Sequence, residues 1–158
     1  MPDYGVDTDQ WQALPWSWAA QRLVAARNYW LVTVSATGRP HALPVWGVWY
    51  EVERRFCFSC GPRSRKASDL AANAQVCVAP EDTVEAVSVE GVAAVVRDEP
   101  RLEWWIERYL SKYRPLSPEL SADFLRENVL VEVTPERAFA VIEREQEFAT
   151  RATRWRFP

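Results

Sequence analysis

The sequence predicts a single mainly β domain of the α+β class, built on an antiparallel sheet that closes into a barrel. Short apolar segments rich in β-branched and aromatic residues follow one another and are separated by tight turns, which is typical of antiparallel strands. The segment at residues 85–97 is long and contains Gly91, a position for a bend or bulge, and this favours a barrel over an open sandwich. A chain of 158 residues is long enough to bury one sizeable core.

The composition narrows the class of protein. A hydrophobic content of 48% argues against disorder, and no apolar run approaches the length of a membrane span. The first ten residues form a loose polar leader without the pattern of a signal peptide, so we expect a soluble cytoplasmic protein. The net charge of -3 argues against sequence-independent binding of nucleic acid.

Seven segments have the composition or the alternation of strands: residues 29–36, 41–51, 56–60, 75–79, 85–97, 129–134 and 137–142. The last two flank an expected turn at Pro135 and Glu136, and residues 150–158 are expected to form a tail. An imperfect apolar stripe predicts a helix over residues 11–27, with Pro15 near its start.

A helical excursion is predicted at residues 101–127, between the fifth and sixth strands. Pro100 opens its first helix, and a second, shorter helix is expected near residues 118–128. One continuous apolar stripe marks the first helix: Leu102, Trp105, Ile106, Tyr109, Leu110 and Tyr113. We interpret this stripe as core packing and not as an aromatic ligand site, because any amphipathic helix requires this spacing.

The residues that could carry function are concentrated in residues 28–73. The third strand ends at Gly61 and Pro62, after which Ser64 is placed to cap a helix over residues 64–73. The first turn of this helix carries two cations, Arg65 and Lys66. Cations are disfavoured at the positive end of a helix unless an anion lies between them, so we expect an anionic group here, typically a phosphate. Lys112, on the later helix, is expected to lie away from this site.

Cysteine and histidine chemistry offers little else. The three cysteines are expected to be free thiols, because they are an odd set in a chain without an export signal. Redox or metal chemistry at Cys57 and Cys60 is disfavoured, because they would lie on opposite faces of one strand. His41 is the only histidine, so no histidine-cluster metal site is expected. His41 is a weak candidate for a catalytic proton donor, and pairing with a backbone group or surface water is the favoured interpretation. No metal site is expected in the acidic turn at residues 81–85 either.

Two stretches carry a resemblance to a known family, GRPHALPVWGVW and FSCGPRSRKASDLAAN. They resemble the FMN-binding split β-barrel superfamily, which is similar to pyridoxamine 5'-phosphate oxidase, and within it the flavin- and deazaflavin-dependent oxidoreductases. The resemblance implies an antiparallel split barrel of about six to eight strands with peripheral helices. It also implies a homodimer with the cofactor at the subunit interface.

The resemblance also implies the cofactor-binding residues: Pro44, Val45, Trp46, Ser59, Cys60, Ser64, Arg65, Lys66, Trp155 and Arg156. The Ser64–Lys66 segment would hold the phosphate, Pro44, Val45 and Trp46 would lie against the ring, and Trp155 with Arg154 or Arg156 would reach the partner's cofactor. Leu43 and Val48 stand where the true oxidases have an arginine and a lysine for FMN. That departure argues against oxidation of pyridoxamine phosphate and favours the deazaflavin coenzyme F-420 over FMN.

We therefore expect a dimeric oxidoreductase that transfers a hydride between a flavin-type cofactor, F-420 or FMN, and a small organic acceptor. The alternative is a non-catalytic flavin or haem carrier of the same fold, which would bind cofactor without reducing any acceptor. A third hypothesis, an interaction module that uses the basic tail RATRWRFP, is disfavoured by the acidic total charge. The sequence does not identify the substrate, because this scaffold serves different chemistries.

Overall fold

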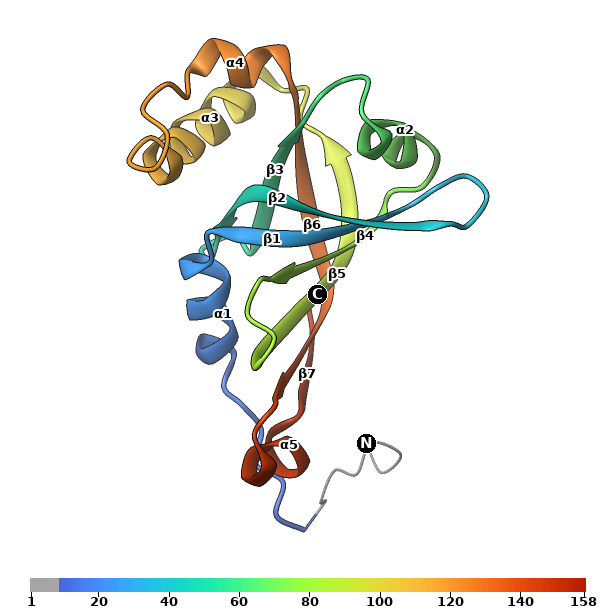
Figure 1. The fold of residues 1–158 in the computed structure, drawn as a ribbon, viewed down its shortest axis with the longest axis vertical. Helices are drawn as coiled ribbons and strands as arrows, with labels where there is room; N and C mark the ends of the chain where they lie inside the picture. The colour runs from blue at the N-terminus through green and yellow to red at the C-terminus, as the bar shows by residue number, and fades with distance from the viewer. Residues whose placement is uncertain (1–8) are drawn as a thin grey trace.

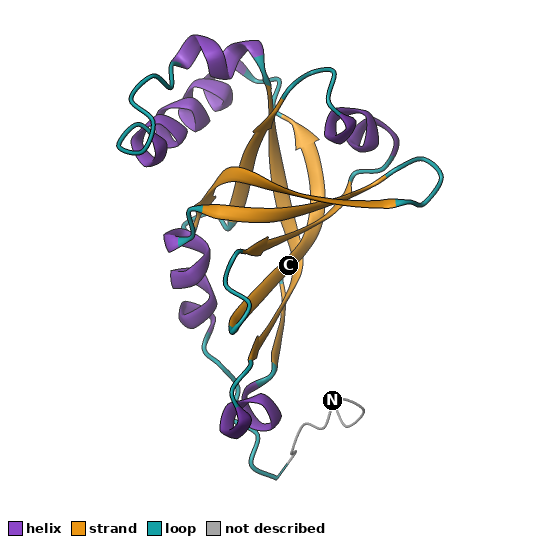
Figure 2. Ribbon diagram, in the orientation of Figure 1, coloured by secondary structure: helices purple, strands orange, loops and turns teal. Residues whose placement is uncertain are grey.

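In the computed structural model of the protein, which describes residues 9–158, a closed antiparallel barrel of six strands carries a seventh strand and five helices (Figures 1 and 2). The α+β barrel expected from the sequence is confirmed. Residues 1–8, most of the expected leader, lie outside the described part.

The strands are bounded as follows: β1 (Asn28–Val34), β2 (Pro40–Tyr50), β3 (Arg55–Cys60), β4 (Gln75–Pro80), β5 (Glu85–Val95), β6 (Val129–Ile142) and β7 (Thr153–Arg156). The helices are α1 (Trp16–Ala25), α2 (Arg65–Ala72), α3 (Glu99–Tyr113), α4 (Ala122–Glu127) and α5 (Glu145–Arg151). Helix α1 begins later than predicted. Pro15 is its N-cap residue, and a proline disfavours the helical conformation for the residue before it, here Leu14.

The sheet has the order β3-β2-β1-β4-β5-β6-β7, and an additional pairing of β3 with β6 closes the barrel. Strand β2 changes partner along its length. Its first part pairs with β1 as far as Trp46, and its second part pairs with β3 from Gly47 onward. The change of partner therefore falls at Trp46, one of the residues expected to lie against the cofactor ring.

Strand β6 corrects one prediction, because it runs through Pro135 without a turn. Gly91 of β5 lies opposite Pro135 while Glu90 lies opposite Arg137, so Glu136 is an extra residue that bulges from the ladder. A bulge accommodates a proline, which has no N–H group to donate. Gly91 is required there, since a Cβ atom would collide with the carbonyl oxygen of Thr134.

The C-terminal tail is also more ordered than expected. Helix α5 turns the chain back, and β7 pairs with the second half of β6, with Ala138 opposite Trp155 and Arg137 opposite Arg156. In Figure 1 α5 and β7 lie at the end of the molecule opposite α2, α3 and α4.

The apolar interior forms two clusters. One fills the barrel, with Tyr29, Phe56 and Phe58 fully buried. The other packs the predicted stripe of α3, including the fully buried Trp105, against the outer side of β2 and β3. Cys57 belongs to the second cluster and Cys60 to the first, which confirms that the two thiols lie on opposite faces. Among the described residues no helix is long and apolar enough to cross a membrane.

Candidate functional site

Helix α2 begins just after β3 ends, and its first turn carries the predicted basic residues. The hydroxyl of Ser64 accepts a hydrogen bond from the N–H of Ala67 at 3.3 Å, so the predicted cap is confirmed. Arg65 and Lys66 follow in a first turn that has no acidic residue. The first N–H groups of a helix lack partners within it and carry partial positive charge, so this end of α2 favours an anion.

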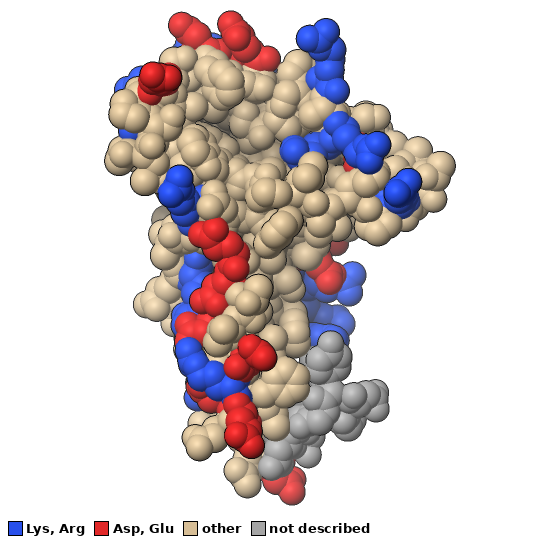
Figure 3. All heavy atoms as spheres, in the orientation of Figure 1, with Lys and Arg blue, Asp and Glu red and all other residues tan. Residues whose placement is uncertain are grey.

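Four basic residues belong to this region. Arg63, Arg65 and Lys66 come from α2 and the turn before it, and Arg39 comes from the hairpin between β1 and β2. Figure 3 shows basic side chains over α2 and over the adjoining hairpin. None of the four forms an ion pair with another described residue, whereas Arg101 and most other arginines of the barrel strands and of α3 do. Unpaired cations side by side repel one another, so an anionic ligand would stabilise this cluster.

A pocket of about 340 Å³ opens beside the start of α2. Its lining includes six of the residues predicted to bind cofactor: Pro44, Val45, Trp46, Ser59, Cys60 and Lys66. Ser64 and Arg65 are adjacent in sequence to Lys66 but do not line it. The pocket therefore has an apolar wall from β2, a polar end from β3 and one cation from α2.

The opposite wall was not predicted. It comes from the helical excursion and the residues around it: Tyr109, Leu120, Phe124 and Asn128. The sequence did single out Tyr109, because it lies in the apolar stripe of α3, but we interpreted that stripe as core packing alone. Tyr109 does both, since it is 2% exposed and also lines the pocket. Phe124 is 53% exposed, and nothing in the sequence distinguishes it from a surface residue.

Helix α3 fixes the apolar wall through the polar tips of its aromatic residues. The Trp46 ring stacks on Tyr113 with centroids 4.5 Å apart and planes 3° apart. The Tyr109 hydroxyl donates to the carbonyl oxygen of Trp46 at 2.6 Å, and the N–H of Gly47 donates to the Tyr113 hydroxyl at 2.8 Å. Burial raises the pKa of Tyr113 to about 12 and raises that of Tyr109, so both hydroxyls stay protonated.

Lys112 does not lie away from the site, as the sequence suggested. Its ammonium donates to the hydroxyl of Tyr29 at 2.9 Å and to the carbonyl oxygen of Gly47 at 2.8 Å, directly behind the pocket wall. Burial lowers the pKa of Lys112 to about 8. The prediction was wrong because a lysine on a helix is usually exposed. The position of Lys112 beside the apolar stripe of α3 does not reveal that its side chain extends to the backbone of β2.

Cys60 is the cysteine that lines the pocket. Burial raises the pKa of the Cys60 thiol, so Cys60 faces the pocket as a neutral group. All three thiols are free, and no group of three metal-ligating side chains occurs among residues 9–158.

His41 has a partner that neither interpretation of the sequence included. Its Nδ1 lies 2.8 Å from Oδ2 of Asp69 on α2, and the hydroxyl of Thr33 donates to the same oxygen at 2.7 Å. Asp69 is 4% exposed. The hydrogen bond from Thr33 and the contact with His41 lower the pKa of Asp69, so the buried carboxylate is ionised.

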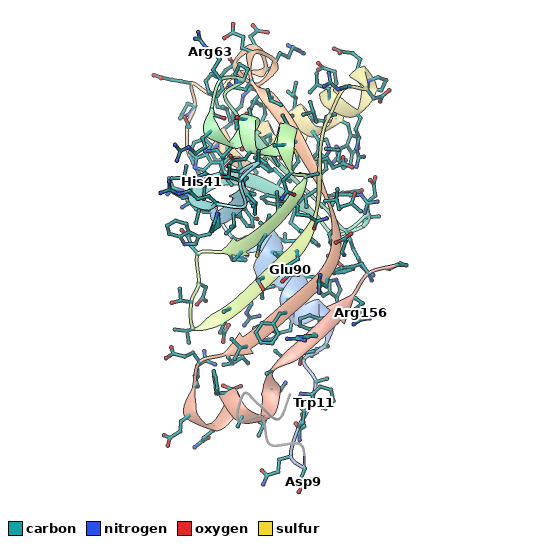
Figure 4. All side chains as sticks on the ribbon, turned by 90° about the vertical axis from the view of Figure 1, so that its right-hand side faces the viewer. Asp9, Trp11, His41, Arg63, Glu90 and Arg156 are labelled. Atoms are coloured by element: carbon teal, nitrogen blue, oxygen red, sulfur yellow. The ribbon has the colours of Figure 1, made fainter. Side chains whose placement is uncertain are left out.

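Trp155 and Arg156 lie apart from the pocket of their own chain. Trp155 packs edge-on against Trp16 with centroids 5.4 Å apart. Arg156 and Trp155 line a second cavity of about 290 Å³ on β5, β6 and β7. Figure 4 shows Arg156 on the side of the molecule opposite His41. Their expected contact with a partner's cofactor stays a prediction.

Two larger hollows contain none of the residues predicted to bind cofactor. One of about 410 Å³ lies between the β2–β3 turn and the C-terminus, around Arg54 and Phe157. The other, of about 580 Å³, is an almost wholly apolar groove between α2 and the ends of β5 and β6, with Arg97 as the single charged residue in its lining. The first hollow also combines Arg54, which forms no ion pair with a described residue, with Phe157, but neither hollow is lined by any of the residues predicted to bind cofactor.

Comparison with known proteins identifies the family and supports the fold. The family model for pyridoxamine 5'-phosphate oxidase matches residues 19–142. No curated protein matches the sequence. Among solved structures, General Stress Protein 26 from Bacillus anthracis has a TM-score of 0.65 at 17% identity, over 89% of this chain and 97% of that one.

Two other similar structures differ in what their names say they bind. An FAD-binding protein from Mesorhizobium loti has a TM-score of 0.62 at 17% identity, over 79% of this chain and 92% of that one. The haem storage protein HutZ from Vibrio cholerae has a TM-score of 0.64 at 20% identity, over 82% and 95%. At such identities the likeness shows the fold alone. The family match covers most of the chain, and the chain therefore belongs to the pyridoxamine 5'-phosphate oxidase family of split barrels.

Proposed function

We propose that the protein is an oxidoreductase that binds a phosphorylated flavin-type cofactor, with the phosphate at the start of α2 and the ring in the pocket beside it. One observation carries the proposal. Residues from three separate elements, β2, β3 and α2, line one pocket, and a cluster of unpaired cations adjoins it.

The donor set fits such a cofactor. Arg65 and Lys66, with the free N–H groups of α2, suit a phosphate, which charge-assisted hydrogen bonds hold firmly. The wall around Trp46 is flat and apolar and is held rigid by its stack on Tyr113, as a tricyclic ring requires. When bound, the cofactor supplies two-electron hydride transfer. The chain's own residues then bind, orient and shield it from water, and none of them needs to be a nucleophile.

Between the two cofactors, we propose the deazaflavin coenzyme F-420 ahead of FMN. Leu43 and Val48 provide no charge at the two positions on β2 where the oxidases resembled by this chain carry an arginine and a lysine. Val48 is buried against α3, and Leu43 is 46% exposed. FMN remains the second candidate.

We further propose that two copies of the chain form the functional unit. The outer face of β1, β2 and β4 is apolar and partly exposed, with Trp30 opposite Pro44 and Val32 between Ala42 and Cys77. Trp30 is 46% exposed. A second copy on this face would cover an apolar surface that adjoins the pocket and could supply its own Trp155 and Arg156.

The alternative is a non-catalytic carrier of flavin or haem. The likeness to HutZ in fold motivates it. The pocket lining in the described part includes no histidine, and the Cys60 thiol is protonated, so haem would find no strong axial ligand there.

The experiment is a titration of purified protein with FMN and with F-420, followed by absorbance, and then a turnover assay with the reduced cofactor and a panel of acceptors. Saturable binding with acceptor-dependent oxidation of the cofactor supports the proposal. Binding without any turnover supports the carrier, and no binding of either cofactor overturns both.

A further inference from the structure

Asp69 determines which nitrogen of the His41 ring is available to a ligand. An ionised carboxylate only accepts hydrogen bonds, so Nδ1 of His41 must carry the proton that it shares with Oδ2 of Asp69. This holds whether the ring is neutral or charged. The remaining ring nitrogen, Nε2, is then an acceptor in the neutral ring and a donor in the imidazolium.

Nε2 has no partner in the described part of the chain and is open to solvent. No hydrogen bond joins it to a described residue, and it is not among the buried polar atoms that lack a partner. The His41 side chain is 16% exposed. A ligand can therefore reach Nε2 from outside.

His41 is also close to the basic start of α2. Asp69 is four residues after Arg65, and side chains four residues apart share one face of a helix. The charge of Arg65 also contributes to the low pKa of Asp69, after the larger effects of Thr33 and His41. Asp69, which the His41 ring contacts, therefore lies about one helical turn along α2 from Arg65.

We propose that His41 is the proton-linked member of the anion site: its imidazolium donates the Nε2 proton to the anionic group at the start of α2, while Asp69 positions the ring. The inference rests on the proposed function, because that function places the phosphate there. When His41 is neutral beforehand, anion binding takes up one proton from solvent, and affinity for the anion falls as pH rises.

The groups in direct contact with His41 and Asp69 do not compete with the ring for protons. The lowered pKa of Asp69 keeps it ionised above about pH 5, and Thr33 is neutral. The other charged groups nearby are two arginines, Arg65 on α2 and Arg39 in the hairpin. Histidine is the side-chain type that changes charge between about pH 5 and 8. Burial raises the pKa of Cys60 beyond this range. Lys112, whose pKa is about 8, contacts Tyr29 and Gly47 and no residue of the His41 cluster.

Sulfate is the probe that tests the proposal, because its charge does not change over this range. His41 is the only histidine, so its ring nitrogens can be followed by NMR without assignment ambiguity. In the free wild-type protein we expect the tautomer protonated at Nδ1. Sulfate should shift the Nε2 signal and the backbone amides of Arg65 and Lys66, with affinity about tenfold higher near pH 5 than near pH 8.

Two variants separate positioning from contact. His41→Gln should bind sulfate equally weakly at both pH values. Asp69→Asn should keep the ring but move its proton to Nε2 in the neutral state, and should reduce the pH dependence.

The outcomes are distinguishable. If the amides of α2 shift but the ring does not, or if affinity is independent of pH, the role of His41 is overturned and the proposed function stands. If sulfate moves neither the amides nor the ring, the anion site and the proposed function fail together.

Discussion

Replacing Lys66 with alanine tests the phosphate position directly. Lys66 lines the pocket and has no ion-pair partner among the described residues, so its ammonium is available to a ligand. A hydrogen bond to a charged group contributes about 1.5–3 kcal/mol, which corresponds to roughly ten- to a hundredfold in dissociation constant. Binding should be weakened and not abolished, because Arg65 and the helix N–H groups remain.

The assay is a titration of the variant and the wild type with F-420 and FMN, and with riboflavin, which has the ring of FMN but no phosphate. Lys66→Ala should weaken binding of the phosphorylated cofactor and leave riboflavin binding unchanged. The difference between wild type and variant should shrink from about 0.1 M to about 1 M salt, because screening weakens the wild-type contact. Stability should hardly change, since a cation in the first turn of a helix is not stabilising.

The control variant is Arg144→Ala. Arg144 pairs with Glu85 at the end of the barrel away from α2, and its side chain is 51% exposed. Lys112→Ala is unsuitable as a control, although Lys112 was expected to lie away from the site, because Lys112 supports the pocket wall. Equal affinity of wild type and Lys66→Ala for the phosphorylated cofactor would refute the phosphate position.

Further predictions concern stability and assembly. The pKa of Lys112 is about 8 in the folded protein and 10.5 ordinarily, so between these pH values the unfolded chain binds more protons than the folded one. The free energy of unfolding should therefore rise from about pH 8 to about pH 10. Lys112→Met should abolish this rise in denaturant titrations. Thr33→Val removes the hydrogen bond that is the largest cause of the low pKa of Asp69. The free energy of unfolding should fall by about 1–3 kcal/mol at neutral pH. Below about pH 4 the variant should lose less further stability than the wild type, because a carboxylate with a lowered pKa stabilises the fold only while it is ionised. Gly91→Ala should lower the unfolding free energy by about 1–3 kcal/mol in thermal denaturation, because the new Cβ would collide with the backbone of Thr134. Gly61→Ala is the control and should have little effect on stability, since its new Cβ would meet only Asn128 Oδ1 at 3.9 Å. Light scattering at micromolar concentration should give a dimer that Trp30→Glu dissociates, and a folded wild-type monomer would contradict the proposed assembly.

Local signals in the sequence predicted the barrel and half of the pocket well. Ser64 identifies the start of α2 because its hydroxyl satisfies a backbone N–H, a requirement that depends only on neighbouring residues. The alternation of Val87 and Val89 predicts the buried face of β5 for the same reason.

Features that depend on distant residues could not be predicted. Pro135 indicates a turn in isolation, and only its pairing with Gly91 makes a bulge the better solution. Strand β7 has too few residues for a periodic signal and exists because β6 extends beyond β3 and presents an unpaired edge. The partnership of His41 with Asp69 joins a strand to a helix, which no spacing along the chain reveals.

The pocket has walls from β2, β3, α2 and the α3–α4 excursion, and this makes a bound cofactor a cross-link between segments that meet only after the barrel closes. The closing pair, β3 with β6, joins residues on either side of that excursion, so barrel closure depends on long-range contacts that form slowly. A ligand that binds only the closed barrel stabilises it by mass action, by about 2.7 kcal/mol at a concentration one hundred times its dissociation constant. The cell's supply of cofactor would then control how long each copy of the protein survives, independently of how fast it turns over substrate.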